Sequence, residues 1–306
     1  MVVFLDKKKE KNLEHVDDTL KELEQHGTSE LPLEVYEDNC EIYKAVYTHW
    51  HKEMEIVYIT KGKGIFRLNK EVIHVSEGDI VLISKEMIHY IRTDRKNILH
   101  FKSLVFDLSI LYGQIGDLCQ RGLIEPLIKN EIEIAHIIRN NEPCYEEFLK
   151  IYLKIIRTYR EKEPYFYVEL KSLFFAMFFI LLKEHYILPA EGVDHKTVAS
   201  IKEILDYIES HYKEDLSVSD LANLVHYSDS YLMKVFKQYM GKTLVSYINE
   251  LRIEKSKYLL IHSDLSITEI SMESGYNNSS YYIRKFQELQ GITPQKFRKF
   301  NRTKDY

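Results

Sequence analysis

The spacing of hydrophobic and polar positions separates a strand-forming stretch from two helical ones. Between residues 35 and 106, short runs rich in β-branched and aromatic residues alternate with turn sequences such as Lys61-Gly62-Lys63-Gly64 and Glu77-Gly78-Asp79. Regularly spaced strands of this kind predict an antiparallel sandwich or a small barrel.

Apolar residues recur at helical spacing on both sides of that stretch. Residues 7–26 predict an amphipathic helix, and residues 108–188 predict further helices. Each of three prolines in the second stretch lies near an expected helix start: Pro126, Pro143 and Pro164. Residues 189–192 have the composition of a linker, and the chain beyond them is helical.

The last third of the chain contains an internal repeat, with an offset of 49 residues that aligns Leu216 with Leu265. Each copy opens with a helix-start signature, a serine followed three residues later by an acid, at Ser217 and at Ser266. Each copy then breaks, restarts on a cluster of Ser, Asn or Asp, and continues into a second apolar-periodic segment. The repeat therefore predicts two helix-turn-helix units.

Apolar residues on one side of each unit predict its core: Leu221, Leu224, Leu232, Val235 and Phe236 in the first, and Ile270, Tyr282, Ile283 and Phe286 in the second. The other side of each second helix is short and polar near its start and cationic one turn later: Ser228, Asp229, Ser230 and Lys234, and then Asn278, Ser279, Ser280 and Arg284. A recognition helix needs that arrangement, because its first residues enter the major groove and a basic side chain one turn later reaches a guanine or a phosphate.

Residues 243–261, between the two copies, predict a connecting helix. A helix of about 18 residues is about 27 Å long. It can hold two recognition helices about one turn of DNA, or about 34 Å, apart. One chain could thus read two successive major grooves.

The distribution of charge agrees with a DNA-binding C-terminal region. The net charge of the chain is −5, divided into −7 over residues 1–195 and +2 over residues 196–306. Positive charges gathered on one domain attract phosphates over about 8–10 Å, whatever the net charge of the rest.

Residues 197–300 resemble the AraC/XylS family of bacterial regulators. The sequence GYNNSSYYIRKFQELQGITPQKFRK is similar to the family's signature, and YINELRIEKSKYLL is similar to its connecting helix. The resemblance implies base or phosphate contacts in both units: Ser230, Met233 and Lys234 in the first, and Ser279, Ser280 and Arg284 in the second. The chain departs from the family at His226, where Gly often stands, and a positive φ there would cost about 1 kcal/mol.

The densest cluster of potential ligands is the segment from His49 to Glu55. Alternation along a strand would place four of its side chains on one face: His49, His51, Glu53 and Glu55. The segment resembles the first cupin motif, His-x-His, three residues, Glu, six residues and Gly62. The second motif, from Gly78 to His89, matches in spacing but lacks the usual Pro-x-Gly.

The resemblance to a cupin-like sensor implies that the barrel binds an organic effector, and a polar, aromatic pocket suits a sugar. The expected pocket residues are His49, His51, Glu55 and His89, with Trp50 or Tyr58 as stacking partners. Two readings stay open beside it. In the first, imidazoles and a carboxylate hold a divalent metal at His49, His51, Glu55 and His89. In the second, the histidines are structural.

The helical segment after the barrel contains a marked apolar stripe: Leu173, Phe174, Met177, Phe178 and Leu181. The stripe is buried either against the barrel or in a homodimer interface. Its most hydrophobic run, residues 173–182, has about half the length needed to span a bilayer. The three cysteines are odd in number and far apart, and the N-terminus has no signal-peptide core, so we expect a cytoplasmic protein without a membrane segment.

The sequence as a whole predicts an α+β protein with a cupin-like barrel, a helical dimerisation segment and an all-α domain with two helix-turn-helix motifs. The expected domains are a helical arm (1–30), the barrel (31–107), the helical segment (108–190) and the DNA-binding domain (196–306), in which the motifs occupy 216–239 and 265–289.

We expect a sequence-specific transcription regulator, an activator that answers to a small-molecule effector, and not an enzyme. Its expected partners are double-stranded operator DNA, the effector, RNA polymerase and a second copy of the chain, with no cofactor. The alternatives are a metal-dependent cupin enzyme fused to a DNA-binding domain and a constitutive regulator with an inert barrel.

Overall fold

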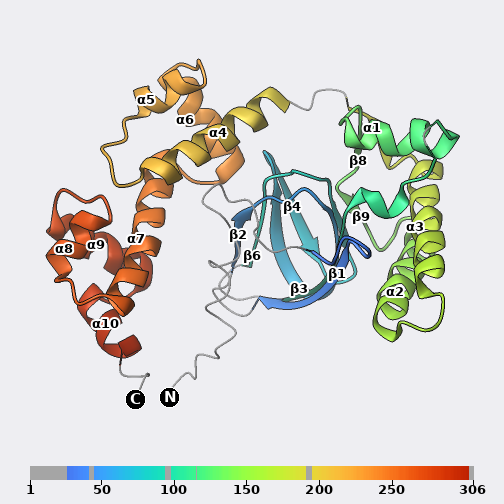
Figure 1. Cartoon of the computed structure of the whole chain (residues 1–306), viewed down its shortest axis with the longest axis horizontal. Coiled ribbons are helices and arrows are strands. Elements are labelled where there is room, and N and C mark those ends of the chain that lie inside the picture. The colour runs from blue at the N-terminus through green and yellow to red at the C-terminus, as the bar shows by residue number, and fades with distance from the viewer. Residues whose placement is uncertain (1–25, 41–44, 94–97, 115, 191–194, 303–306) are drawn as a thin grey trace. The chain divides into compact units, whose positions relative to one another are not determined.

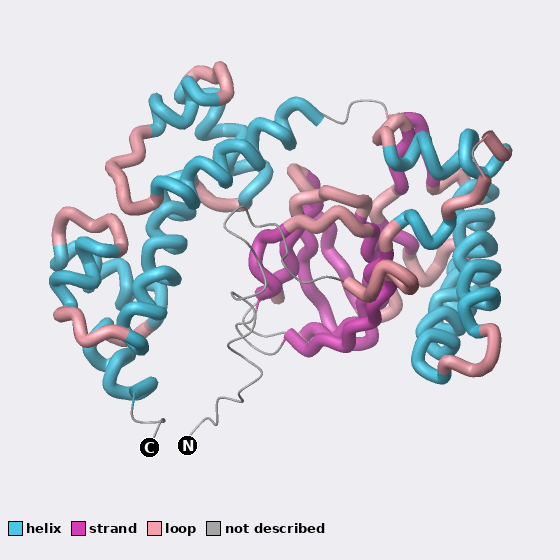
Figure 2. Tube along the Cα trace, in the orientation of Figure 1, coloured by secondary structure: helices cyan, strands magenta, loops and turns pink. Residues whose placement is uncertain are grey.

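The computed structural model describes residues 26–40, 45–93, 98–114, 116–190 and 195–302 (Figure 1). Its chain divides into two compact units, residues 1–194 and residues 195–306. Most of the N-terminal helix expected over residues 7–26 lies outside the described residues. The first unit holds the described strands and several helices, and the described part of the second is helical (Figure 2). The expected α+β class is confirmed.

The main sheet is antiparallel and is built around one long strand. Its strands are β1 (Leu33–Cys40), β2 (Ala45–His49), β3 (Met54–Leu68), β4 (Glu71–Ser76), β5 (Ile80–Ile83), β6 (His89–Arg92), β7 (Leu99–Phe106) and the short β9 (Ile137–Ile138). The first half of β3 pairs with β5 and β7, and its second half pairs with β4 and β6. Because β3 belongs to both layers, the sheet folds over itself and encloses an apolar interior.

The two faces of β3 contact different cores. Val57 and Ile59 point to the interior of the sheet and pack with Phe66 and Phe101. Ile56, directly before Val57, and Tyr58, between Val57 and Ile59, belong to a second core that the sheet shares with helices. This alternation follows from the period of two along a strand, and it decides which side chains can line the barrel.

The second core lies between the sheet and a pair of helices, α2 (Tyr145–Glu161) and α3 (Phe166–Lys183). The rings of Phe106 and Phe174 are 4.6 Å apart between their centroids, and the Tyr152 hydroxyl donates to the Lys102 carbonyl at 2.6 Å. All members of the predicted apolar stripe of α3 are buried in this core. Burial within the unit therefore accounts for that stripe, and any dimer must use another face.

The segment between β7 and α2 is less helical than its apolar period predicts. It contains a 3₁₀ turn (Leu108–Leu111), a π-helical turn (Gln120–Ile124), α1 (Glu125–Ile128) and the strands β8 (Ile132–Ile134) and β9. β8 pairs with β10 (Ile187–Pro189), and β9 pairs with β5. The expectation that helices fill residues 108–188 was wrong over this segment, because short isoleucine-rich segments complete a sheet edge when one is within reach.

The second unit consists of helices in its described residues: α4 (His195–His211), α5 (Val218–Leu224), α6 (Asp229–Met240), α7 (Leu244–His262), α8 (Ile267–Glu273), α9 (Ser279–Gln290) and α10 (Pro294–Arg302). α7 contacts α6 as well as α8, α9 and α10, so it joins the two helix pairs (Figure 1). Within the described residues, none of the helices combines the length and the apolarity that crossing a membrane requires.

Candidate functional site

The two helix-turn-helix units begin with equivalent caps. The Ser217 hydroxyl accepts from the Asp220 amide at 3.1 Å before α5, and the Ser266 hydroxyl accepts from the Glu269 amide at 3.2 Å before α8. Only the second cap is reciprocal, because the Glu269 carboxylate also accepts from the Ser266 amide at 2.7 Å. That backbone hydrogen bond lowers the pKa of Glu269 below its usual value.

The turns of the two units share one backbone conformation. His226 has a φ of 58° and the aligned Gly275 has a φ of 83°. The Tyr227 amide donates to the Ala222 carbonyl at 2.8 Å, and the Tyr276 amide donates to the Ser271 carbonyl at 2.9 Å. A positive φ is ordinary for glycine and strained for histidine. His226 thus adopts the positive φ that the sequence left open at this departure from the family's glycine.

The inner faces of α6 and α9 anchor them in the unit. Leu232 and Phe236 are fully buried in α6, as are Tyr282 and Phe286 in α9. The Tyr282 hydroxyl also donates to the hydroxyl of Ser256 at 3.1 Å, and burial raises its pKa to about 12. The prediction that Ile283 belongs to this stripe was wrong: the side chain is 36% exposed.

The outer faces carry the predicted DNA contacts. Most of these side chains are exposed: Ser230, Met233 and Lys234 on α6, and Asn278, Ser280 and Arg284 around α9, with Ser279 half-buried. Lys234 and Arg284 take the same place in their helices, and the Arg284 guanidinium lies over the Tyr281 ring at 5.2 Å. Asn278 also caps α9, because its side-chain oxygen accepts from the Tyr281 amide at 3.0 Å.

Not every cation near the C-terminus is available to a ligand. Arg298 of α10 donates to the backbone carbonyls of Leu260 and Leu265, at 3.3 Å and 2.5 Å. Its guanidinium therefore ties α10 to the segment between α7 and α8, although the sequence groups it with the other basic residues of the tail.

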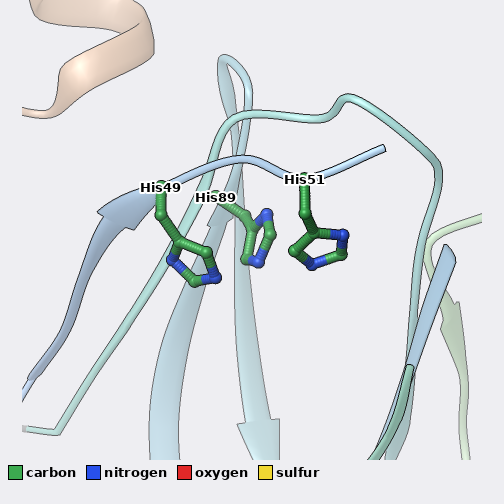
Figure 3. Close-up of side chains that lie close together, drawn as sticks. All are labelled: His49, His51 and His89. Carbon is green, nitrogen blue, oxygen red and sulfur yellow. The ribbon is translucent and has the colours of Figure 1, made fainter. Parts of the chain in front are cut away.

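In the N-terminal compact unit, residues 1–194, three histidines converge at one end of the sheet (Figure 3). His49 ends β2, His51 follows it in the connection to β3, and His89 begins β6. The centroids of the His49 and His89 rings are 4.1 Å apart, and those of His51 and His89 are 5.1 Å apart. A ligand nitrogen of each lies within 4.8 Å of the others.

Glu55 of β3 completes the cluster. Its Oε2 lies 3.4 Å from Nε2 of His51 and 3.3 Å from Nε2 of His89. Burial raises the pKa of this carboxyl, but hydrogen bonds and charge from the two histidines outweigh burial and hold the pKa well below its usual value. We call His49, His51, His89 and Glu55 the histidine cluster.

Backbone carbonyls fix the orientation of two of these rings. Nδ1 of His51 lies 3.1 Å from the Glu53 carbonyl, and Nδ1 of His89 lies 2.8 Å from the Met87 carbonyl. Because a carbonyl oxygen only accepts, each Nδ1 carries the proton. Where these rings are neutral, each Nε2 directs a lone pair toward Glu55; where a ring carries a second proton, its Nε2 donates to the carboxylate.

The structure corrects two of the predictions about this cluster. β2 ends at His49 and β3 begins at Met54, so no single strand places the histidines and Glu53 on one face. Tyr58 does not share their space: it lies on the opposite face of β3, where its ring is 6.1 Å from that of Tyr152 in α2. Trp50 is half-buried beside His49 in the chain.

Two further residues lie near the cluster, and no sequence motif pointed to them. His26 is buried, and its ring centroid is 5.4 Å from that of His51. Its Nδ1 lies 2.9 Å from the hydroxyl of Tyr36 in β1. His26 precedes the first strand and follows no motif, so no pattern of spacing could have connected it with residues 49–55.

Comparisons with known proteins assign each unit to a domain type. A model described as a helix-turn-helix domain matches residues 221–299, and one described as an AraC-like ligand binding domain matches residues 31–139. The two matches lie in different units.

Two curated relatives and one solved structure are similar to most of the chain. YdeC, an uncharacterized HTH-type transcriptional regulator of Bacillus subtilis, is 28% identical over 94% of this chain and 98% of its own length. The Msm operon regulatory protein of Streptococcus mutans is 26% identical over 80% of this chain and 83% of its own. The structure of unsaturated fatty acid bound ToxT from Vibrio cholerae is 18% identical over 90% of this chain and 96% of that chain, with a TM-score of 0.39.

Proposed function

Since the chain belongs to the AraC family of DNA-binding transcription regulators and carries the family's ligand-binding domain, we propose that α6 and α9 read a specific operator and that the histidine cluster binds a small polar effector. The observation that carries the DNA proposal is the pair Lys234 and Arg284. Each is exposed at the same place in a helix whose inner face is fully buried.

Local chemistry supports a base-reading role for these helices. The residues before each cation are short and polar, which lets the start of the helix approach base edges in the major groove. Met233 is 48% exposed beside Lys234 and offers an apolar contact of the kind that thymine methyl groups accept. Arg284 supplies the planar fork that pairs with guanine.

Selection from a random pool of double-stranded DNA tests this function. The full-length protein should enrich one sequence, and the K234A/R284A double variant should lose most of that affinity. Lys129→Ala, which removes an exposed cation from the first unit, is the matched control and should bind like the native protein. A native protein that enriches no sequence would refute the proposal.

The buried polar groups of the histidine cluster support a polar effector. A site of imidazoles and a carboxylate offers both donors and acceptors to hydroxyl groups, as a sugar presents them. A thermal-shift screen of sugars with the full-length protein should find a compound that raises the melting temperature, because a ligand of the native state stabilises it. The shift should vanish in His89→Ala. Silence across a broad panel would favour a constitutive regulator with an inert barrel.

We propose a homodimer through the outer face of α3. Val168, Phe175, Phe179 and Leu182 follow heptad spacing along this helix, and Phe179 is 64% exposed. An apolar seam with that period fits a second helix, and a second copy of the chain supplies the same seam by symmetry. Light scattering should give a dimer for the native protein and a monomer for Phe179→Glu, with Lys150→Glu, at an exposed position of α2, as the control.

We further propose that the operator-bound dimer contacts RNA polymerase and activates transcription. Transcription in vitro from the selected operator, with and without effector, decides the sign. A fall in transcript on adding the protein would make it a repressor.

A second candidate function for the histidine cluster is to hold a divalent metal ion, and the orientation of its rings favours it. Two Nε2 lone pairs and an ionised carboxylate converge within 3.4 Å, so these groups repel one another unless a proton or a cation lies between them. Imidazoles that donate their other N–H to a carbonyl are typical metal ligands. His49, His51, His89 and Glu55 therefore fit the ion, which would supply Lewis-acid chemistry.

Metal analysis of the purified protein separates the two candidates. A stoichiometric Fe, Mn or Zn ion that is lost on His49→Ala would favour the metal, and turnover of a substrate would favour the fused enzyme. His74→Ala is the control, because His74 is an exposed strand histidine. A protein that stays metal-free after incubation with these ions would exclude the metal and favour the organic effector as the ligand of the histidine cluster.

A further inference from the structure

The second helix-turn-helix unit contacts the end of α4 directly, and this junction is separate from the surfaces described so far. α4 packs against α5 and α6, so it belongs with the first helix-turn-helix unit. The three residues after α4, residues 212–214, reach across to α7 and to the turn before α9. We call this contact the α4–α7 junction.

Arg252 of α7 is its central residue. Its Nε donates to the carbonyl of Tyr212 at 2.7 Å, and its Nη2 donates to the carbonyl of Glu214 at 2.7 Å. The same guanidinium lies over the ring of Tyr276, 5.6 Å from its centroid. Tyr276 is buried in the turn of the second unit, and its hydroxyl donates to the Asn249 carbonyl of α7 at 3.2 Å.

The turn of the second helix-turn-helix unit packs closely against the backbone of residues 212–213. A Cβ on Gly275 would lie 2.5 Å from the Tyr212 carbonyl oxygen and 2.9 Å from Nε of Arg252. Glycine is therefore required at this position by the approach of residues 212–213 as well as by its positive φ. The aligned His226 of the first turn is exposed.

Two ion pairs flank the arginine. Lys255 of α7 lies 2.6 Å from Glu209 of α4, whose side chain is 4% exposed, and Lys213 lies 3.2 Å from Glu273 of α8. Three elements of the second unit are thus connected to the end of α4. A rotation of the second helix-turn-helix unit about the axis of α7 would separate Gly275 and Glu273 from the residues that follow α4.

We propose that Arg252 is a positioning residue that fixes the spacing at which the protein reads its two half-sites. The inference rests on the proposed DNA-reading function of α6 and α9. Since α7 alone could bend or turn, the junction makes the two recognition helices a rigid pair. Inserting one base pair between half-sites moves the second by about 3.4 Å and about one tenth of a turn, which a rigid pair cannot follow.

The test uses full-length protein and the operator that it selects, with none, one, two or three base pairs inserted between the two enriched blocks. Native protein should lose affinity about tenfold or more on the first insertion, as for about one mismatched contact or more. Arg252→Ala should bind the uninserted operator more weakly and lose less than about threefold per insertion. Arg252→Lys, which cannot donate to both carbonyls in the same fork, should lie between them.

Controls separate position from contact and from folding. Arg284→Ala should weaken binding at every spacing and keep the native insertion penalty. Lys257→Ala, which removes a cation of α7 that pairs with Glu254 within the helix, should behave as native. If Arg252→Ala melts before the measurement, Arg252→Lys and the pair Lys255→Met with Glu209→Gln give the same comparison.

The outcomes distinguish this inference from the function on which it rests. An unchanged insertion penalty in folded Arg252 variants would overturn the junction and leave DNA reading intact. Selection of only one block would also overturn it, because one reader has no spacing to keep. If the native protein selects no DNA, the proposed function fails and the spacing role fails with it.

Discussion

The first and second helix-turn-helix units have the same backbone and different surroundings. Both turns adopt a positive φ and close with matching hydrogen bonds, yet one uses His226 and the other Gly275. The first turn is open to solvent, whereas residues 212–213 and Arg252 cover the second. A local conformation can therefore tolerate a strained residue, but a close backbone approach cannot tolerate any side chain.

The largest effect is expected from a side chain placed in the covered turn. Gly275→Ala should lower the free energy of unfolding by about 2–4 kcal/mol, because the new Cβ meets backbone as well as an unfavourable φ. His226→Ala, the matched change in the open turn, should alter it by about 0.5 kcal/mol or less. Urea denaturation followed by circular dichroism measures both, and equal losses would remove the distinction.

The next largest effect is a difference in DNA affinity between variants of the two recognition helices. Arg284→Ala should weaken binding to the selected operator by about 1–3 kcal/mol and relax its preference at one position if the guanidinium reads a base edge. Lys234→Ala should cost about 1 kcal/mol and weaken all sequences alike if the ammonium acts as a phosphate contact. Fluorescence anisotropy with operator and scrambled DNA checks both, and unchanged affinity would reject the residue as a contact.

The caps should differ by a smaller amount. Glu269→Ala removes the carboxylate that accepts from the Ser266 amide, so it should lower the melting temperature more than Asp220→Ala, which removes no bond to the Ser217 amide. Both variants keep the serine hydroxyl that accepts from the third amide of its helix. Thermal melts of the two variants provide the comparison. A larger loss from Asp220→Ala would mean that the reciprocal bond adds nothing.

The smallest effect should be a gain. His226→Gly relieves the strain of a positive φ and should raise the free energy of unfolding by up to about 1 kcal/mol, reduced by the greater freedom of glycine in the unfolded chain. The same denaturation experiment measures it. A loss of stability would show that the exposed imidazole makes a contact worth more than the strain.

Much of the helical unit, residues 195–306, could be predicted because the sequence features that specify its helices are local. Caps, turns and the apolar period of a helix depend on residues within about one or two turns of each other. Ile283 was misassigned because it lies at the edge of the apolar stripe, where burial depends on which neighbours pack there. Likewise, Tyr58 is an aromatic residue of the kind that lines ligand pockets, and only its packing against α2 shows which face of β3 it occupies.

The sequence by itself determined the repeat, the helix boundaries to within a few residues, the strand-rich character of the first unit and the residue types at both candidate sites. The tertiary structure decided which of those residues meet. His49 and His89 are adjacent only because β2 pairs with β6, His26 reaches His51 from before the first strand, and Gly275 is covered by a loop far away in the chain. Contacts between distant segments arise from the packing of whole elements, and no short-range pattern encodes them.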